Sequence, residues 1–210
     1  MKKILLILGI TILLTGCFLK EDLQKFTEKY ARGYMDLMYH NDKALYKETT
    51  NETDEKLLSL YEESVEIESD YFIEFFELEN ISNEDKTRLT SLIKKAYDKT
   101  KYEISLKEKI NEEKYSYNIT IQPNNIIKLT EDSLIAAMNS AAEEELNTLL
   151  NNWNKEILNI LEKEIDNIGY FETVTVELVV YKADNGLWTF DEDDLSDIDT
   201  QVVKYDYNEE

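Results

Sequence analysis

The chain has 210 residues, a formal net charge of −22 at pH 7, and 45 acidic against 23 basic side chains. This excess of negative charge repels phosphate backbones and therefore excludes nucleic acid as an expected partner. Hydrophobic residues form 42% of the chain, while glycine occurs five times and proline once, so we expect a sizeable core and a helix-rich fold.

The N-terminal segment has the features of a bacterial lipoprotein signal peptide. Lys2 and Lys3 precede an apolar run over residues 4–14, which has the length of the apolar region of a signal peptide. This run is too short to cross a bilayer as a helix, which takes about 20 residues. It leads into Leu-Thr-Gly-Cys, which resembles the lipobox of bacterial lipoproteins. The resemblance implies cleavage between Gly16 and Cys17 and a diacylglyceryl group on the Cys17 thiol.

This interpretation predicts the domain organisation and the location of the protein. Residues 1–16 form the expected signal peptide, and residues 17–210 a single extracytoplasmic domain that begins at the lipidated Cys17. Two acyl chains, such as palmitate, anchor a protein stably where one chain binds marginally, so we expect attachment to the cell membrane. Because Cys17 is the only cysteine, we expect no disulfide and no thiol chemistry. The alternative is an uncleaved hydrophobic tail, or an ordinary signal peptide in which the cysteine occurs by chance.

Three helices are expected next. Apolar residues recur at helical spacing over residues 23–45, 54–79 and 82–98. The polar segment TTNETDEK separates the first two helices, and Ser82 with Asp85 predicts a capping box at the start of the third.

The periodicity then changes from 3.6 residues to 2. Apolar and polar residues alternate over 101–110 and again over 115–122, which predicts a β-hairpin with one solvated and one buried face. Pro123 is expected to end the second strand, because proline cannot donate a ladder hydrogen bond.

A long helix and a second hairpin complete the expected elements. The helix spans 130–168, with Thr130 as N-cap and Gly169 in the C-cap position. The hairpin spans 171–190, and its Asn-Gly pair at 185–186 predicts a tight type I′ turn.

The order of these elements predicts an α+β fold. It contains a curved antiparallel sheet of about four strands packed against long helices, and the tail over 200–207 is expected to add an edge strand.

Three stretches resemble a family of uncharacterised lipoproteins from Gram-positive bacteria with a domain of unknown function. The stretches are YARGYMDLMYHNDKALYKE, YSYNITIQPNNI and VTVELVVYKADNGLWTFDEDD, and the resemblance covers most of residues 20–195. It implies a fold similar to that of nuclear transport factor 2 and the cystatin-like proteins, in which a curved sheet encloses helices. That fold hosts enzymes, binding modules and scaffolds, so it does not by itself imply a function.

Several tyrosines are candidates for a ligand pocket. A tyrosine buries a ring and keeps a polar hydroxyl, which suits the wall of a pocket in the concave sheet. The candidates are Tyr30, Tyr34, Tyr102 and Tyr117, and the alternative is that they lie at the edges of the core.

The search for a catalytic or metal site returns few residues. His40 is the only histidine and is expected on the surface, and no phosphate-binding loop, zinc motif or nucleophile motif occurs. Asp191, Asp193 and Asp194 offer oxygen ligands of the kind that Ca²⁺ takes, but the segment lacks the alternation and the glycine of a calcium-binding loop. We therefore expect a solvated turn at 191–199, no metal and no cofactor.

Two functions remain after these exclusions. The first is a lipid-anchored, non-catalytic binding module whose partner is an envelope protein or a small ligand. The alternative is an enzyme of the nuclear transport factor 2-like class, with tyrosines and carboxylates as acid and base in a pocket. A cavity that contains a carboxylate with a raised pKa would distinguish the two.

Overall fold

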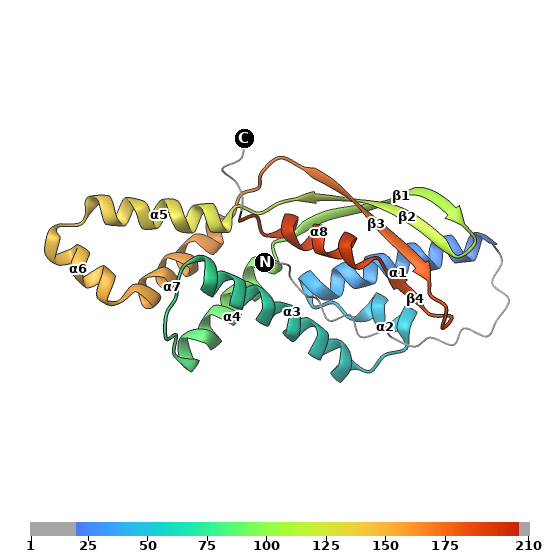
Figure 1. Ribbon diagram of the computed structural model, residues 1–210, viewed down its shortest axis with the longest axis horizontal. Coiled ribbons are helices and arrows are strands. Elements are labelled where there is room, and N and C mark those ends of the chain that lie inside the picture. Colours follow the sequence, from blue (N-terminus) through green and yellow to red (C-terminus); the bar gives the residue numbers. More distant parts are fainter. Residues whose placement is uncertain (1–19, 206–210) are drawn as a thin grey trace.

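The computed structural model describes residues 20–205 and places a four-stranded sheet over a layer of helices (Figure 1). The first helices are α1 (Lys20–His40), α2 (Ala44–Thr50), α3 (Asp54–Phe75) and α4 (Asn83–Tyr97). The strands β1 (Lys101–Asn111) and β2 (Lys114–Gln122) follow, and then the helices α5 (Ile126–Ser140), α6 (Glu143–Asn151) and α7 (Trp153–Glu164), with a 3-10 turn, η1 (Ile165–Asn167). The strands β3 (Val174–Lys182) and β4 (Trp188–Phe190) and the helix α8 (Glu192–Val202) complete the described chain.

The sheet is antiparallel throughout, in the order β1-β2-β3-β4. On β2 every second side chain is fully buried: Tyr115, Tyr117, Ile119 and Ile121. These side chains face α1 and α8, which lie along one side of the sheet (Figure 1). The predicted α+β class, with a curved antiparallel sheet of four strands and a large helical content, is thus confirmed.

The first predicted helix is two helices. α1 ends at His40, Asn41 has a φ of 53°, and the Asp42 carboxylate accepts a hydrogen bond from the N–H of Ala44 at 2.9 Å. The prediction extended the helix to residue 45 because asparagine and aspartate do not interrupt an apolar stripe. Their short polar side chains, however, tolerate the left-handed conformation and satisfy backbone groups outside a helix.

α2 packs directly on the backbone of α1 at Gly33. A Cβ atom placed on Gly33 would lie 2.5 Å from the backbone nitrogen of Tyr46 and 2.8 Å from the carbonyl carbon of Leu45. The absence of a side chain at Gly33 therefore allows the two helices to approach this closely.

The predicted helix over 130–168 is also wrong as one element. Ala141 and Ala142 are extended, with ψ values of 136° and 164°, and the Glu145 carboxylate accepts from the N–H of Ala142 at 2.9 Å. The chain turns there and returns, so that α5, α6 and α7 form a helical arm over residues 126–168, which projects away from the sheet (Figure 1). Because neither alanine disfavours a helix, the sequence pattern gives no sign of this break.

The ends of the arm differ from the prediction as well. α5 begins at Ile126, and Thr130 lies inside it with its hydroxyl donating to the Ile126 carbonyl at 2.8 Å. α7 ends at Glu164 and is followed by η1, so that Gly169 is not a helix C-cap. Glu164 accepts from the Ser133 hydroxyl at 2.9 Å and so joins α7 to α5.

The C-terminal part contains a helix where a turn and an edge strand were predicted. Asp191 is the N-cap of α8, which covers residues 192–202 and replaces the expected turn and the first residues of the expected edge strand. Val203 makes only an isolated bridge to Asn124, and residues 206 and 207 of that prediction lie outside the described residues. In the β3–β4 turn only Gly186 has a positive φ, of 82°, and its N–H donates to the Ala183 carbonyl at 2.8 Å. A type I′ turn needs two successive residues with positive φ, so that prediction is wrong too.

Substitution of Gly33 by alanine should destabilise the protein by about 1–3 kcal/mol, because the new methyl group overlaps the backbone of α2. Alanine has a better helix propensity than glycine by about 1 kcal/mol, so a loss of stability must come from the contact and not from the helix. Urea unfolding followed by circular dichroism measures the difference.

The matched control is Gly169→Ala, where the nearest atoms belong to the movable side chain of Asn125, at 3.3 Å. We expect a smaller loss there. Equal or greater stability of Gly33→Ala relative to the parent protein would contradict the proposed contact between α1 and α2.

Candidate functional site

The helices α3 and α4 form the two walls of an open polar groove. α4 begins at a capping box, as predicted, because the Ser82 hydroxyl accepts from the N–H of Asp85 at 3.1 Å and donates to its carboxylate at 2.8 Å. The groove has a volume of about 610 Å³ and is lined by Glu62, Glu66, Asn83, Lys86, Thr87, Thr90, Ser91 and Lys94. We call it the α3–α4 groove.

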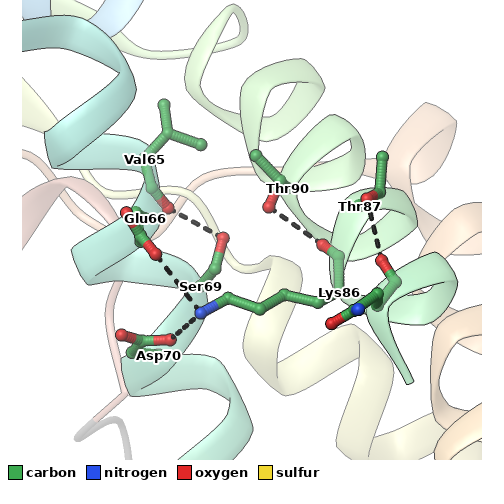
Figure 2. A network of polar contacts seen from close by, with 8 residues as sticks. Val65, Glu66, Ser69, Asp70, Lys86, Thr87 and Thr90 are labelled. Atoms are coloured by element: carbon green, nitrogen blue, oxygen red, sulfur yellow. Dashed lines mark hydrogen bonds and ion pairs between the residues drawn. The ribbon is translucent and has the colours of Figure 1, made fainter. Parts of the chain in front are cut away.

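Two lysines of α4 reach across the groove to carboxylates of α3. The Lys86 ammonium lies 3.0 Å from the Asp70 carboxylate and 3.3 Å from that of Glu66, as Figure 2 shows. Lys94 makes the equivalent contact with Glu62 at 2.6 Å. The hydrogen bond to Asp70 raises the pKa of Lys86, so this lysine is charged at neutral pH.

These ion pairs contribute little to stability. The side chains of Lys86 and Asp70 are 37% and 60% exposed, and exposed pairs of this kind are worth about 0–1 kcal/mol each. A binding partner that offers its own charged groups to these side chains can therefore replace the ion pairs at a small cost in free energy.

Threonine hydroxyls of α4 add hydrogen-bond acceptors to the α3–α4 groove. Thr87 and Thr90 donate to the carbonyls of Asn83 and Lys86, at 2.8 and 2.9 Å (Figure 2). A hydroxyl that donates to the backbone keeps its lone pairs for a further donor. The α3–α4 groove can therefore bind a polar surface of mixed charge.

A buried carboxylate lies on the opposite face of α3. Glu68 is 2% exposed and accepts hydrogen bonds from the hydroxyls of Tyr205 at 2.7 Å and Tyr97 at 3.2 Å. A cavity of about 10 Å³ lies beside it, which is room for about one water molecule. This space does not admit a substrate.

Asp199 on α8 faces the same cavity. It accepts a hydrogen bond from the Tyr39 hydroxyl at 2.5 Å, which joins α8 to α1. Burial and then the negative charge of Asp199 raise the pKa of Tyr39 well above its usual value. Burial and then Glu68 do the same for the pKa values of Tyr97 and Tyr205. The hydroxyls therefore stay protonated and act as donors to the two carboxylates.

Two of the four predicted pocket tyrosines lie together in the core. The ring of Tyr30 stacks on Phe190 at 4.6 Å between centroids, and Tyr34 contacts the same ring at 4.8 Å. The Tyr30 hydroxyl donates to the Trp188 carbonyl at 3.1 Å. These rings fill the space between α1 and β4.

The other two tyrosines lie at separate points of the sheet. Tyr117 is fully buried, and its hydroxyl shares a 2.7 Å hydrogen bond with that of Thr27. Tyr102 donates to the Asp36 carboxylate near the C-terminal end of α1 and stacks on His40 at 6.0 Å. The structure thus does not bring the four tyrosines to one place, and their role as pocket walls stays a prediction.

Two of the three aspartates considered for Ca²⁺ accept hydrogen bonds from backbone N–H groups of the fold. Asp191 accepts from the N–H of Asp193 at 3.1 Å as the helix cap, and Asp194 accepts from the N–H of Val179 on β3 at 2.7 Å. Burial raises the pKa of Asp194. Between residues 20 and 205 the structure contains no group of three or more histidine, cysteine or acidic side chains arranged to hold a metal ion.

The sequence analysis predicted neither the charged residues of the α3–α4 groove nor the buried Glu68, although the sequence contains a signal for each. Glu62, Glu66 and Asp70 recur every four residues, which places them on one face of α3. Glu68 falls at a core position of the apolar stripe of the same helix, three residues after Val65. An acidic residue within an apolar stripe predicts a buried, hydrogen-bonded carboxylate.

The predicted lipidation site, Gly16 and Cys17, lies outside the described residues. A family model for the prokaryotic membrane lipoprotein lipid attachment site matches residues 1–17 and ends at Cys17. The chain is therefore a lipid-anchored membrane lipoprotein that faces the outside, as predicted. Across residues 20–205, no helix has the length and apolar character that a membrane span requires.

The fold is similar to that of a solved protein. The crystal structure of YcdA from Bacillus subtilis, described as a putative lipoprotein, superimposes with a TM-score of 0.60 at 18% sequence identity. The match covers 88% of this chain and 58% of the YcdA chain, so this chain spans little more than half of that protein. At this identity the similarity concerns the fold alone. No curated protein sequence matches the chain.

The buried tyrosines predict a loss of stability at alkaline pH. Burial raises the pKa of Tyr30 to about 12 and those of Tyr39, Tyr97 and Tyr205 well above their usual value. An unfolded chain loses these protons near pH 10, whereas the folded protein keeps them, so stability is complete below about pH 10 and falls above it. Each buried tyrosine contributes up to about 1.4 kcal/mol to this loss for each pH unit.

Alkaline titration that follows tyrosinate absorbance and helical circular dichroism together measures this effect. We expect most of the tyrosinate signal to appear in one cooperative step with the loss of helix. The variant Tyr97→Phe should show a shallower decline of the unfolding free energy above about pH 10. Gradual ionisation of all the tyrosines in a protein that keeps its helices would contradict the assignment.

Proposed function

We propose that this protein is a non-catalytic interaction module that a lipidated Cys17 holds at the outer face of the cell membrane. Cleavage after Gly16 makes Cys17 the first residue of the mature chain, and residues 17–210 form one domain. We also propose that the domain has the nuclear transport factor 2-like fold of the Gram-positive lipoproteins that the sequence resembles.

The position of the lipid attachment site supports the anchoring. The matched motif ends at Cys17, and α1 begins at Lys20, three residues later. Lipoproteins that act far from the membrane need a linker, and none separates this anchor from the folded domain. The module therefore works close to the bilayer.

The α3–α4 groove is the observation that favours a protein partner over a small ligand. Sites for small molecules are mostly apolar and enclose the greater part of the ligand. This groove is open and polar, with Lys86 and Lys94 facing Glu62 and Glu66. Exposed charges of both signs suit the polar part of a protein–protein interface, where they fix orientation and partner choice.

Substitution of Cys17 by serine should release the protein from the membrane or leave its precursor uncleaved, because a hydroxyl does not form the thioether. We expect nearly all of the acylated, membrane-bound form to be lost, as measured by fractionation and intact mass. The conservative change Thr11→Ser, within the apolar run, is the control and should leave retention unchanged. Membrane retention with an acylated mass in Cys17→Ser would contradict lipidation at this residue.

The groove is tested by the double variant Lys86→Ala and Lys94→Ala in intact cells of the natural host. Chemical cross-linking should recover a defined partner with the parent protein and about tenfold less with the variant, which corresponds to about 1.4 kcal/mol of binding free energy. Lys128→Ala is the matched control, because Lys128 forms an exposed pair with Asp132 on the arm, away from the groove. Equal recovery from both variants would exclude the groove as the interface.

A further inference from the structure

We propose that the turn between β1 and β2 makes a second contact with the membrane, with Ile110 as its apolar residue, while the arm points away from the bilayer. This inference rests on the proposed lipidation of Cys17. We call the end of the sheet that contains this turn the hairpin end.

The covalent chain restricts the distance between the lipid and the fold. Lys20, where α1 begins, is three residues after Cys17, and an extended chain over these three steps spans at most about 11 Å. The first turn of α1 therefore lies at the membrane surface whenever the acyl chains are inserted.

Hydrogen bonds fix the hairpin end beside the first turns of α1. The Tyr117 hydroxyl donates to the Gln24 carbonyl at 3.1 Å and bonds the Thr27 hydroxyl at 2.7 Å. β2 begins at Lys114, three residues before Tyr117, so the turn lies next to the start of α1 (Figure 1). The arm lies at the opposite end of the long axis of the molecule (Figure 1).

Ile110 is an exposed apolar residue at this end. Its side chain is 45% exposed, and it lies at the register shift between Lys109 and Asn111, one residue before the end of β1. Transfer of a large aliphatic side chain from water into an apolar phase lowers the free energy. The bilayer interface provides such a phase within reach of the anchor.

The charges of the two ends favour the same orientation. Residues 107–114 contain three lysines and three glutamates, and residues 182–186, at the same end of the sheet, contain one lysine and one aspartate. These two turns are therefore neutral together, although the whole chain carries −22. The arm, residues 126–168, contains nine acidic and three basic side chains. An anionic membrane surface repels the arm and does not repel the hairpin end.

The exposed lysines of the hairpin end are suited to lipid headgroups. Lys109 and Lys182 pair with Glu112 and Glu113 at 2.8 and 3.1 Å, and these side chains remain between 33% and 64% exposed. Such pairs can exchange a carboxylate for a lipid phosphate at little cost. Ile110 and these lysines together present the apolar and cationic groups that an interface accepts.

The test uses two cysteine variants of the full lipidated protein in phosphatidylcholine vesicles. Lipidation consumes the only native thiol, so a cysteine introduced by Ile110→Cys or Ile135→Cys is the single site for an environment-sensitive fluorophore. Ile135 on the arm is the matched control, because it is the same residue type and is 48% exposed. We measure quenching by spin-labelled lipid and by aqueous iodide.

We expect several-fold stronger quenching by the spin-labelled lipid at position 110 than at position 135, and the reverse with iodide. Equal access of iodide to both labels, or a lipid-exposed label on the arm, overturns the proposed orientation.

Flotation of the vesicles distinguishes failure of the membrane anchoring from failure of the second membrane contact. If the protein floats with the vesicles and position 110 stays in water, anchoring holds and the second contact is wrong. If the protein does not float, the anchoring itself fails, and this inference fails with it.

Discussion

The packing of α1 against the inner face of the sheet is the contact on which the other elements depend. The Thr27–Tyr117 hydrogen bond and the stacked rings of Tyr30 and Phe190 hold the helix to β2 and β4. α2 then packs on α1 at Gly33, and α8 joins it through Asp199. Since no disulfide is available to this chain, these side-chain contacts must hold the layers together.

Tyrosine serves this fold in a way that phenylalanine could not. Glu68 is buried and Asp199 is partly buried, and a carboxylate removed from water is costly without hydrogen-bond donors. Tyrosines 39, 97 and 205 supply a ring to the apolar core and a hydroxyl to these acids. The same buried network that satisfies the acids leaves space for about one water molecule, and this favours a module that binds at its surface, in the α3–α4 groove.

The sequence predicts the parts of the fold whose periodicity is uninterrupted. Strict alternation over β2 locates both the strand and its buried face, and the Ser82 box locates the start of α4. The sequence does not predict the arm, because the chain reverses at Ala141 and Ala142 without any residue that disfavours a helix. The α3–α4 groove can be predicted in part. The four-residue spacing of the acidic residues of α3 is visible in the sequence, but their ion pairs with α4 depend on how the two helices pack.

The position of the arm has a consequence for the folding kinetics of the sheet. The arm connects two neighbouring strands, β2 and β3, whose pairing must otherwise wait for the closure of a loop of about 50 residues, with a large entropic cost. The contacts that join α5 to α7, such as that of Ser133 with Glu164 31 residues later, close a shorter loop than the strand pairing does and therefore cost less entropy. Once the arm has formed, Asn125 and Gly169 at its base are joined by two hydrogen bonds, and the strand ends are already adjacent. The arm thus allows one long loop closure to be replaced by two shorter ones.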